Sequence, residues 1–374
     1  MNILLIGEYS GLHNELKNAL IAQGHNVTLA ASNDFWKKLD VDISLGHGSN
    51  IYSYKARQFL LPLLKLREFQ GYDIVHLINF YTLPRSPKLN LFFIKYLKEN
   101  NNVITISGAG DDPFFVRFSE ETLRYSPIPS HEKYDRKALY YMRGERHLEA
   151  MHESLSYIDG VIPIMYEYYS TFCKAGYTEK VSKPIPIPIN CNKIEFIENT
   201  VSTKLVFFHG LNRRGFKGTF LIEKSFADLE KKYPNDVKCV IEGNLPFKQY
   251  MELLKTTNIS VDQTFSYSLA MNALYSMAQG KLVIGGVEPE SAILYDGVLP
   301  PAYNAQPETS ALLKVFEQVL DQRNRIPEIS KLSRAFVEEK HSPELVAKEY
   351  IQFWQNILNK KQGKIVLDNQ ISRT

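Results

Sequence analysis

The sequence contains few cysteines, no long apolar run and almost no excess of charge. Its 374 residues include three cysteines, Cys173, Cys191 and Cys239, which form neither a C-x-x-C pair nor the spacing of zinc ligands. This usage argues against a disulfide framework and is typical of a reducing compartment. No apolar run reaches the ~18 residues that a membrane-spanning helix needs. The opening MNILLIG reads as a strand and lacks the features of a signal peptide, so we expect a cytoplasmic protein.

The charge balance bears on the class of partner. Lys and Arg number 44 against 41 Asp and Glu, a net charge of +3, which does not indicate a nucleic-acid partner. Two segments, residues 51–69 and 85–98, mix apolar and basic side chains. Such segments either pack as helices on a sheet with their cations reaching water, or lie on anionic lipid. Peripheral contact with the inner face of a membrane therefore stays open.

The length and the 44% apolar content suit two domains. Residues 2–30 read as strand, helix and strand, a Rossmann-like opening that lacks the dinucleotide fingerprint G-x-G-x-x-G. Residues 183–190, KPIPIPIN, must be extended because proline recurs. We expect an α/β fold with a first domain at 1–183, a linker at 184–200, a second domain at 201–341, and a final helical segment, 342–374, packed back on the first domain.

The most informative stretch runs from residue 205 to residue 286. A buried strand at 205–208 leads into residues 209–218, which hold three glycines and three cations, Arg213, Arg214 and Lys217, just before a helix. Glycines allow close backbone approach, and a helix start together with fixed cations suits a diphosphate. A solvated turn at a sheet edge is the alternative. Strand and helix patterns then alternate, which predicts a parallel sheet that binds ligands at the carboxyl ends of its strands.

These motifs carry a family resemblance. The series H-G-x-N-R-x-G-F-K-G, I-E-G, V-D-Q and N-A-L-x-x-M-A-x-G-K resembles the C-terminal half of a GT-B glycosyltransferase. More narrowly, it is similar to the large, mostly retaining clan that includes bacterial capsule and O-antigen glycosyltransferases. The resemblance implies two Rossmann-like domains that face a cleft. It also implies sugar transfer from a nucleotide-diphosphate donor, UDP- or GDP-linked, to a saccharide or lipid-linked saccharide acceptor in surface polysaccharide biosynthesis. No other cofactor is expected, and no metal either, because two cations face the diphosphate and no D-x-D stands in a suitable loop.

The resemblance also assigns the donor site. Arg213 and Lys217 would grip the diphosphate and neutralise the leaving group, with Arg214 as a substitute for Arg213. The other donor-binding candidates are Gly210 in the same loop, Glu242, Gly243 and Asn244 near the nucleotide base, Ala270, Met271 and Asn272 at a helix start, and Tyr275 at the ribose.

One departure from the family pattern weakens the catalytic reading. The clan has an E-x7-E pair, and the corresponding positions here are Tyr267 and Tyr275. This loss favours the rival interpretation, a non-catalytic GT-B homologue that acts as a nucleotide-binding or scaffolding subunit. Glu288 and Glu290 could replace the lost carboxylates, although a turn explains them equally well.

The first half offers acceptor-binding candidates at the ends of its predicted strands. Ser10, Gly11 and His13 follow the first strand, although His13 could equally be a surface histidine near a helix start. Asn79 ends a strand at 73–79, and Asp111 follows a strand at 103–107. Asp111 could orient an acceptor hydroxyl or take its proton, whereas an Asx-turn or helix cap before Pro113 is the alternative, for Asp112 above all. The catalytic candidates are thus Asp111, His13, Arg213 and Lys217.

Overall fold

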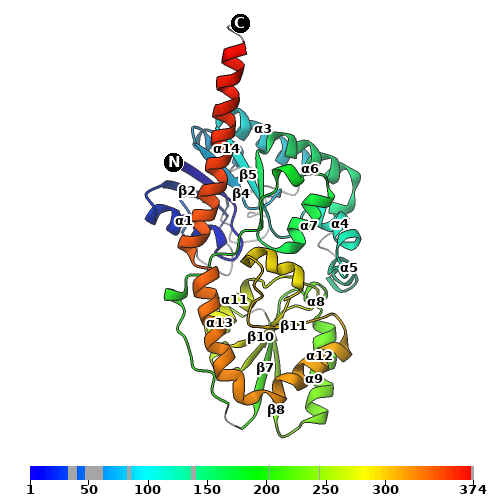
Figure 1. Ribbon diagram of the computed structural model, residues 1–374. Coiled ribbons are helices and arrows are strands. Elements are labelled where there is room, and N and C mark those ends of the chain that lie inside the picture. Colours follow the sequence, from blue (N-terminus) through cyan, green and yellow to red (C-terminus); the bar gives the residue numbers. More distant parts are fainter. Residues whose placement is uncertain are drawn as a thin grey trace.

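The computed structural model describes residues 1–32, 40–46, 62–81, 86–135, 140–201, 203–243 and 245–371. In these ranges the chain forms one six-stranded and one five-stranded β-sheet, with helices packed around both (Figure 1). The described strands pair in parallel throughout. The predicted α/β class with two Rossmann-like domains is confirmed.

The first sheet is built from short apolar runs. Its strands β4 and β6 are buried at every position, as expected for parallel strands covered on both faces. In order across the sheet, the strands are β3 (Ile43–Ser44), β2 (Asn26–Ala31), β1 (Asn2–Ile6), β4 (Ile74–Leu77), β5 (Val103–Gly108) and β6 (Gly160–Pro163).

Two apolar clusters hold the helices of the first domain on the two faces of this sheet. Successive strand residues point to opposite faces. Leu4 and Val75 therefore pack with α3, α6 and α7, whereas Ile3 and Ile74 pack with α1 and α14. The helices of this domain are α1 (Leu12–Ala22), α3 (Pro87–Asn100), α4 (Pro113–Thr122), α5 (Ile128–Asp135), α6 (Glu145–Tyr157), α7 (Tyr166–Lys174) and the late α14 (Pro343–Ile371).

The second sheet follows the same plan. Helices α9 and α12 pack on one face through a cluster that includes Phe207, Phe226 and Phe316. The strands, in order across the sheet, are β11 (Tyr303–Asn304), β10 (Leu282–Gly285), β9 (Ile259–Val261), β7 (Leu205–Leu211) and β8 (Val237–Gly243). The helices are α8 (Arg214–Lys217), α9 (Thr219–Lys232), α10 (Phe247–Lys255), α11 (Met271–Ala278), α12 (Thr309–Asp321) and α13 (Ile326–Lys340).

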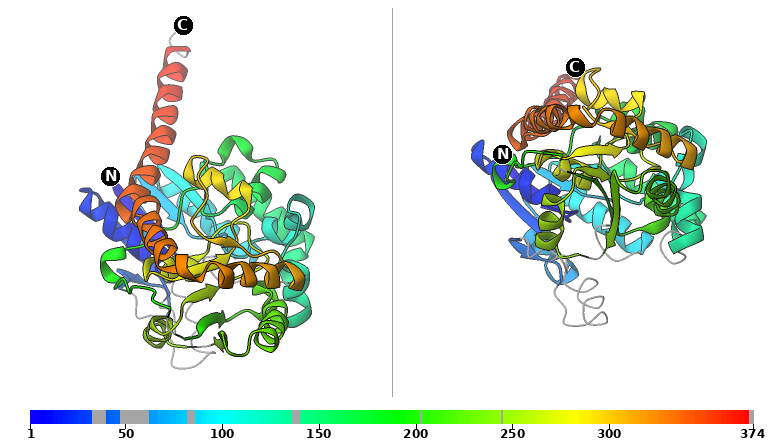
Figure 2. Two further views of the ribbon diagram at one scale, coloured as in Figure 1. Left: turned by 60° about the horizontal axis from the view of Figure 1, so that its bottom comes forward. Right: turned by 90° about the horizontal axis from the view of Figure 1, so that it is seen from below.

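The chain crosses between the domains in two segments that touch each other. Residues 183–190 make the first crossing, and residues 341–342, between α13 and α14, make the second. The Ile189 N–H donates to the His341 carbonyl at 2.8 Å, and His341 Nδ1 donates to the Ile187 carbonyl at 2.8 Å. Helix α14 then packs on the first sheet through Tyr350 and Trp354 and projects beyond that domain (Figure 2). The two crossings therefore meet at a single place.

The basic apolar segments of the first domain are described only in part. Residues 51–61 and 82–85 lie outside the described residues. Residues 87–100 form α3, in which Phe93 and Leu97 are buried against the sheet while Phe92 is half exposed. Within the described ranges, no helix combines the length and the apolar character needed to span a bilayer.

Candidate functional site

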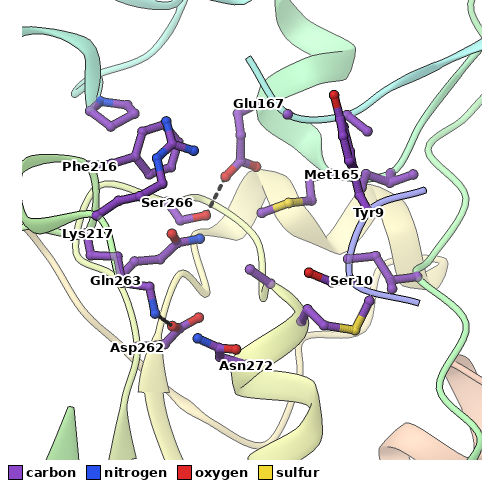
Figure 3. A pocket seen from close by; sticks show the side chains of 18 of the residues that line it. Tyr9, Ser10, Met165, Glu167, Phe216, Lys217, Asp262, Gln263, Ser266 and Asn272 are labelled. Carbon is purple, nitrogen blue, oxygen red and sulfur yellow. Dashed lines mark hydrogen bonds and ion pairs between the residues drawn. The ribbon is translucent and has the colours of Figure 1, made fainter. Parts of the chain in front are cut away.

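Loops that follow the strands of both sheets line a cavity of about 240 Å³ between the domains (Figure 3). The loops after β1, β5 and β6 contribute from the first domain, and those after β7 and β9 contribute from the second. This is the position in which parallel sheets bind ligands. The lining side chains and backbone include Tyr9, Ser10, Ala109, Gly110, Met165, Glu167, Arg213, Phe216, Lys217, Asp262, Gln263, Ser266, Ala270, Met271 and Asn272.

Arg213 lies at the wall of the cavity, where β7 turns into α8. Its Nη2 donates to Asp111 Oδ2 at 2.7 Å and lies 3.2 Å from His131 Nε2. Its guanidinium carbon is 3.7 Å from the ring centroid of Phe216. Since Asp111 and His131 belong to the first domain, Arg213 bridges the two domains. Its side chain remains 34% exposed, so a ligand in the cavity can reach it.

Lys217 reaches the same cavity from the end of α8. Its Nζ donates to Asp262 Oδ1 at 2.8 Å and to the Gly210 carbonyl at 3.0 Å. Both side chains of the ion pair are buried, which fixes the ammonium in place. An ammonium has three donors, and these bonds to described residues use two of them. Gly210 therefore acts through its carbonyl, by holding Lys217.

Arg214 is a correction to the sequence-based prediction. Its guanidinium forms a bidentate ion pair with Glu223 of α9, and it does not line the cavity. Arg213 is the non-helical N-cap residue of α8 and Arg214 is its first helical residue, so the two side chains leave the backbone in different surroundings.

In the loop after β1, the structure separates the acceptor candidates. Ser10 lines the cavity, and Ser10 and Gly11 adopt left-handed backbone conformations with φ of 58° and 98°. His13, by contrast, is fully buried on the inner face of α1 and donates from Nδ1 to the Gly7 carbonyl at 2.7 Å. Burial lowers its pKa to about 4. The prediction that His13 lies on the cleft wall is therefore corrected: the apolar stripe of α1 carries it into the domain core.

Asn79 supports the wall of the cavity and does not form it. Its buried amide donates to the Ala109 carbonyl at 2.5 Å, and its oxygen accepts from the Tyr81 N–H at 2.8 Å. Asn79 thus holds the loop that presents Asp111, which corrects the expectation of direct acceptor contact. Asp112 is the N-cap of α4 and accepts from the Phe115 N–H at 2.8 Å. Burial raises the pKa of Asp112 to about 7.

Helix α11 brings its first turn to the cavity and its second turn to the other domain. Ala270, Met271 and Asn272 line the cavity where the helix starts. Tyr275, one turn further on, donates from its hydroxyl to the Ser10 carbonyl at 3.5 Å, and burial raises its pKa to about 12. Tyr275 does not line the cavity, so its contact with a ribose remains a prediction.

The residues expected at the nucleotide base lie at the end of β8. Glu242 is exposed, and neither it nor Gly243 lines the cavity. A Cβ on Gly243 would come within 2.4 Å of the Leu211 carbonyl oxygen, so packing between β8 and β7 explains this glycine. Asn244 lies outside the described residues. Recognition of a base at this edge remains a prediction.

Glu288 and Glu290 bind the first domain and not the cavity. Both form ion pairs with Arg124, and Glu288 also accepts from the Tyr125 hydroxyl. Tyr267, at the first of the two lost glutamate positions, accepts from the Arg124 N–H and packs its ring under the Arg124 guanidinium. These groups hold the domains together at the edge of the interface, so neither glutamate replaces a carboxylate in the cavity.

Sequence reasoning missed many of the lining residues, among them the polar or charged Glu167, Asp262 and Gln263 and the aromatic Phe216. Asp262 and Gln263 directly follow β9, so the strand-end rule that selected Asp111 would have found them. Glu167 lies inside a tyrosine-rich helix and has no such signal, because the structure alone shows which of its faces meets the second domain.

The cavity can bind an anion flanked by an uncharged polar group. Arg213 and Lys217 supply fixed positive charge, and hydroxyl and amide groups of Ser10, Gln263 and Asn272 supply hydrogen bonds. Within the described ranges, no group of three or more His, Cys, Asp or Glu side chains could hold a metal ion.

Comparisons with known proteins identify the fold. No protein-family model matches the chain, and no curated protein sequence matches it either. Among solved structures, the chain is similar to sucrose-phosphate synthase from Thermosynechococcus elongatus, with 14% identity, a TM-score of 0.62, and coverage of 96% of this chain and 100% of that one.

Two further structures show the same likeness. HepE of Anabaena, crystallised with UDP and glucose, has 12% identity, a TM-score of 0.60, and coverage of 94% and 98% of the two chains. WaaG, a glycosyltransferase involved in lipopolysaccharide biosynthesis, has 13% identity, a TM-score of 0.56, and coverage of 93% and 98%. The likeness extends over both domains, and the chain has the GT-B fold.

Proposed function

We propose that this protein is a glycosyltransferase of the capsule and O-antigen type. It transfers a sugar from a UDP- or GDP-linked donor to a saccharide or lipid-linked saccharide acceptor in surface polysaccharide biosynthesis. The observation that carries the proposal is the position of Arg213 and Lys217, two cations fixed at the wall of a cavity that both domains line. The GT-B fold of the chain, and the UDP and glucose bound by HepE, support a nucleotide-sugar donor.

In this proposal the cations act on the leaving group. As the bond between sugar and diphosphate breaks, negative charge grows on the phosphate oxygens, and Arg213 and Lys217 stabilise it. Backbone amides at the start of α11, near Ala270 and Asn272, add helix-start donors. Closure of the two domains around the bound donor would keep water from the reacting centre. Asp111 pairs with Arg213 and is not itself one of the lining residues of the cavity. In this proposal it orients the acceptor once a ligand engages the Arg213 guanidinium.

The test is a calorimetric titration of the native protein with UDP, GDP and CDP. Arg213→Gln should weaken binding of the preferred nucleotide about tenfold or more, since a hydrogen bond to a charged group contributes about 1.5–3 kcal/mol. Lys217→Met is combined with Asp262→Asn, because a buried unpaired carboxylate would itself destabilise the fold. The matched control is Arg214→Gln, because the native Arg214 guanidinium pairs with Glu223 and does not line the cavity. Native affinity in both cavity variants would refute the site assignment.

A turnover assay separates the enzyme from its rival, the non-catalytic nucleotide-binding subunit. That rival is favoured by Tyr267 and Tyr275, which stand where the family has glutamates and which contact the other domain. Release of nucleoside diphosphate that depends on an acceptor, and that persists in EDTA, supports a metal-independent transferase. Tight nucleotide binding without release, across donors and acceptors, supports the rival.

The proposal also includes a place in the cell. The three cysteines are free in the structure, which is consistent with the expected cytoplasmic location. Peripheral contact with the inner face of the membrane is expected if the acceptor is lipid-linked. Flotation with vesicles that contain anionic lipid tests this contact.

A further inference from the structure

Glu167 carries a carboxylate from the first domain into a loop of the second. It is 5% exposed and lies in the first turn of α7. Its Oε1 accepts from the Ser266 hydroxyl, from the Tyr267 N–H at 3.0 Å and from the Ser268 N–H at 3.4 Å. One oxygen of the carboxylate is therefore fixed by three donors, all from the loop between β9 and α11.

The second oxygen is left unused. Oε2 is buried and, among the described residues, has no hydrogen-bond partner. Asp262, the other carboxylate that lines the cavity, is neutralised by Lys217, whereas no cation of the described residues pairs with Glu167. Burying a carboxylate oxygen without a partner is costly. Desolvation accordingly raises the pKa of Glu167.

The position of this oxygen indicates what would complete it. Glu167 lines the cavity beside Met165 and Ser266, whereas Lys217 and Asp262 lie on a different part of the wall (Figure 3). A phosphate is attracted to Arg213 and Lys217, and the carboxylate of Glu167 repels it. The part of a ligand that reaches Glu167 must therefore be uncharged and able to donate a hydrogen bond.

We propose that Oε2 of Glu167 accepts a hydrogen bond from a hydroxyl of the donor sugar, which makes Glu167 a sugar-binding residue of the cavity. The inference rests on the proposed function, because it takes the ligand to be a nucleotide sugar. The carboxylate comes from α7, and its orientation depends on residues 266–268 of the other domain. The sugar contact therefore exists only when the domains are closed, which couples recognition of the sugar to closure.

The experiment compares two dissociation constants, for UDP and for a UDP-sugar, in native protein, Glu167→Gln and Glu167→Ala. The probes are UDP, UDP-glucose, UDP-galactose and UDP-N-acetylglucosamine. For the preferred sugar, the ratio of the UDP constant to the UDP-sugar constant should fall about tenfold in Glu167→Gln and up to about a hundredfold in Glu167→Ala. Binding of UDP alone should change less than about twofold, which also shows that the cavity is folded. The matched control is Glu179→Gln, an exposed glutamate just after α7, which should leave the ratio unchanged.

Each other outcome overturns the inference in a distinguishable way. If the affinities for UDP and for the UDP-sugar fall by the same factor, Glu167 stabilises the contact between the domains and does not bind the sugar. If both dissociation constants are unchanged and only the KM for the acceptor changes in the turnover assay, the carboxylate contacts the acceptor and not the donor sugar. An unchanged ratio across the whole panel shows that Oε2 touches no sugar. If the native protein binds no nucleotide at all, the proposed function has failed, and this inference fails with it.

Discussion

Replacing Gly215 with alanine should open the interface beside the cavity. Gly215 is in α8, and a Cβ built on it would lie 2.2 Å from the backbone oxygen of Ser130 and 2.8 Å from the Cα of His131, both in α5 of the first domain. Ordinary van der Waals contact begins at 3.4 Å. Because the obstructing atoms belong to the backbone, no side-chain rotation relieves the clash, and the two helices must move apart by about 1 Å.

The cost follows from the contacts that such a shift breaks. The Gly215 N–H donates to Asp135 Oδ2 at 2.9 Å, and Arg213 donates to Asp111 at 2.7 Å. An added 1 Å would stretch both beyond hydrogen-bonding distance. Overpacking costs about 1–3 kcal/mol, so the ratio of closed to open molecules should fall roughly 5- to 150-fold. Within an isolated helix the same change is favourable by up to about 1 kcal/mol, so the loss must come from the interface.

Small-angle scattering and calorimetry check this prediction. Gly215→Ala should have a larger radius of gyration than the native protein and a weaker affinity for the preferred UDP-sugar. Gly363→Ala is the matched control, because this glycine lies in α14 and its added Cβ would meet nothing within 4 Å. If Gly215→Ala shows native scattering and native affinity, the close approach of α5 and α8 does not hold the domains together.

Two further predictions concern stability. Trp354 is fully buried on the first sheet, and its indole N–H donates to Thr105 Oγ1 at 3.0 Å. Trp354→Ala should lower the free energy of unfolding, measured by urea titration, by about 3–5 kcal/mol. A loss below about 1 kcal/mol would show that α14 contributes little to the fold. Acidification should destabilise the protein between about pH 6.5 and 4, because burial lowers the pKa of His13, His209 and His341 to about 4. Above pH 6.5 these histidines are neutral in the folded and the unfolded chain, so they do not change the free energy of unfolding. Between about pH 6.5 and pH 4 only the unfolded chain binds the protons, which lowers the free energy of unfolding by up to about 3 kcal/mol per histidine. Below about pH 4 both states bind the protons, and the loss levels off. Asp112 acts in the opposite direction, since its pKa is raised to about 7. Unfolding measured at pH 7, 5.5 and 4.5 checks the net effect, and a flat or rising stability would contradict it.

Local sequence patterns determined the architecture. Short apolar runs alternating with helical periodicity lead to parallel sheets covered on both faces, because a parallel strand must be buried on both sides. The glycine and cation pattern at residues 209–218 also located the loop between β7 and α9, and the structure places Arg213 and Lys217 at the cavity. Strand ends can be read from sequence since their position depends on nearby residues, and parallel sheets bring those ends to one edge.

The tertiary structure decided which side chains at those ends meet. His13 and Arg214 belong to the same local patterns as Ser10 and Arg213, yet Ser10 and Arg213, which precede α1 and α8, line the cavity. His13, within α1, is buried in the core, and Arg214, within α8, pairs with Glu223. Glu167 and Ser266 are 99 residues apart and meet only where the two domains close. The sequence by itself thus determined two parallel-sheet domains and a cationic loop, since those follow from short-range patterns. The pairing of Arg213 with Asp111 and of Glu167 with residues 266–268 was decided by the domain interface, because no short-range pattern specifies how two separately packed sheets dock.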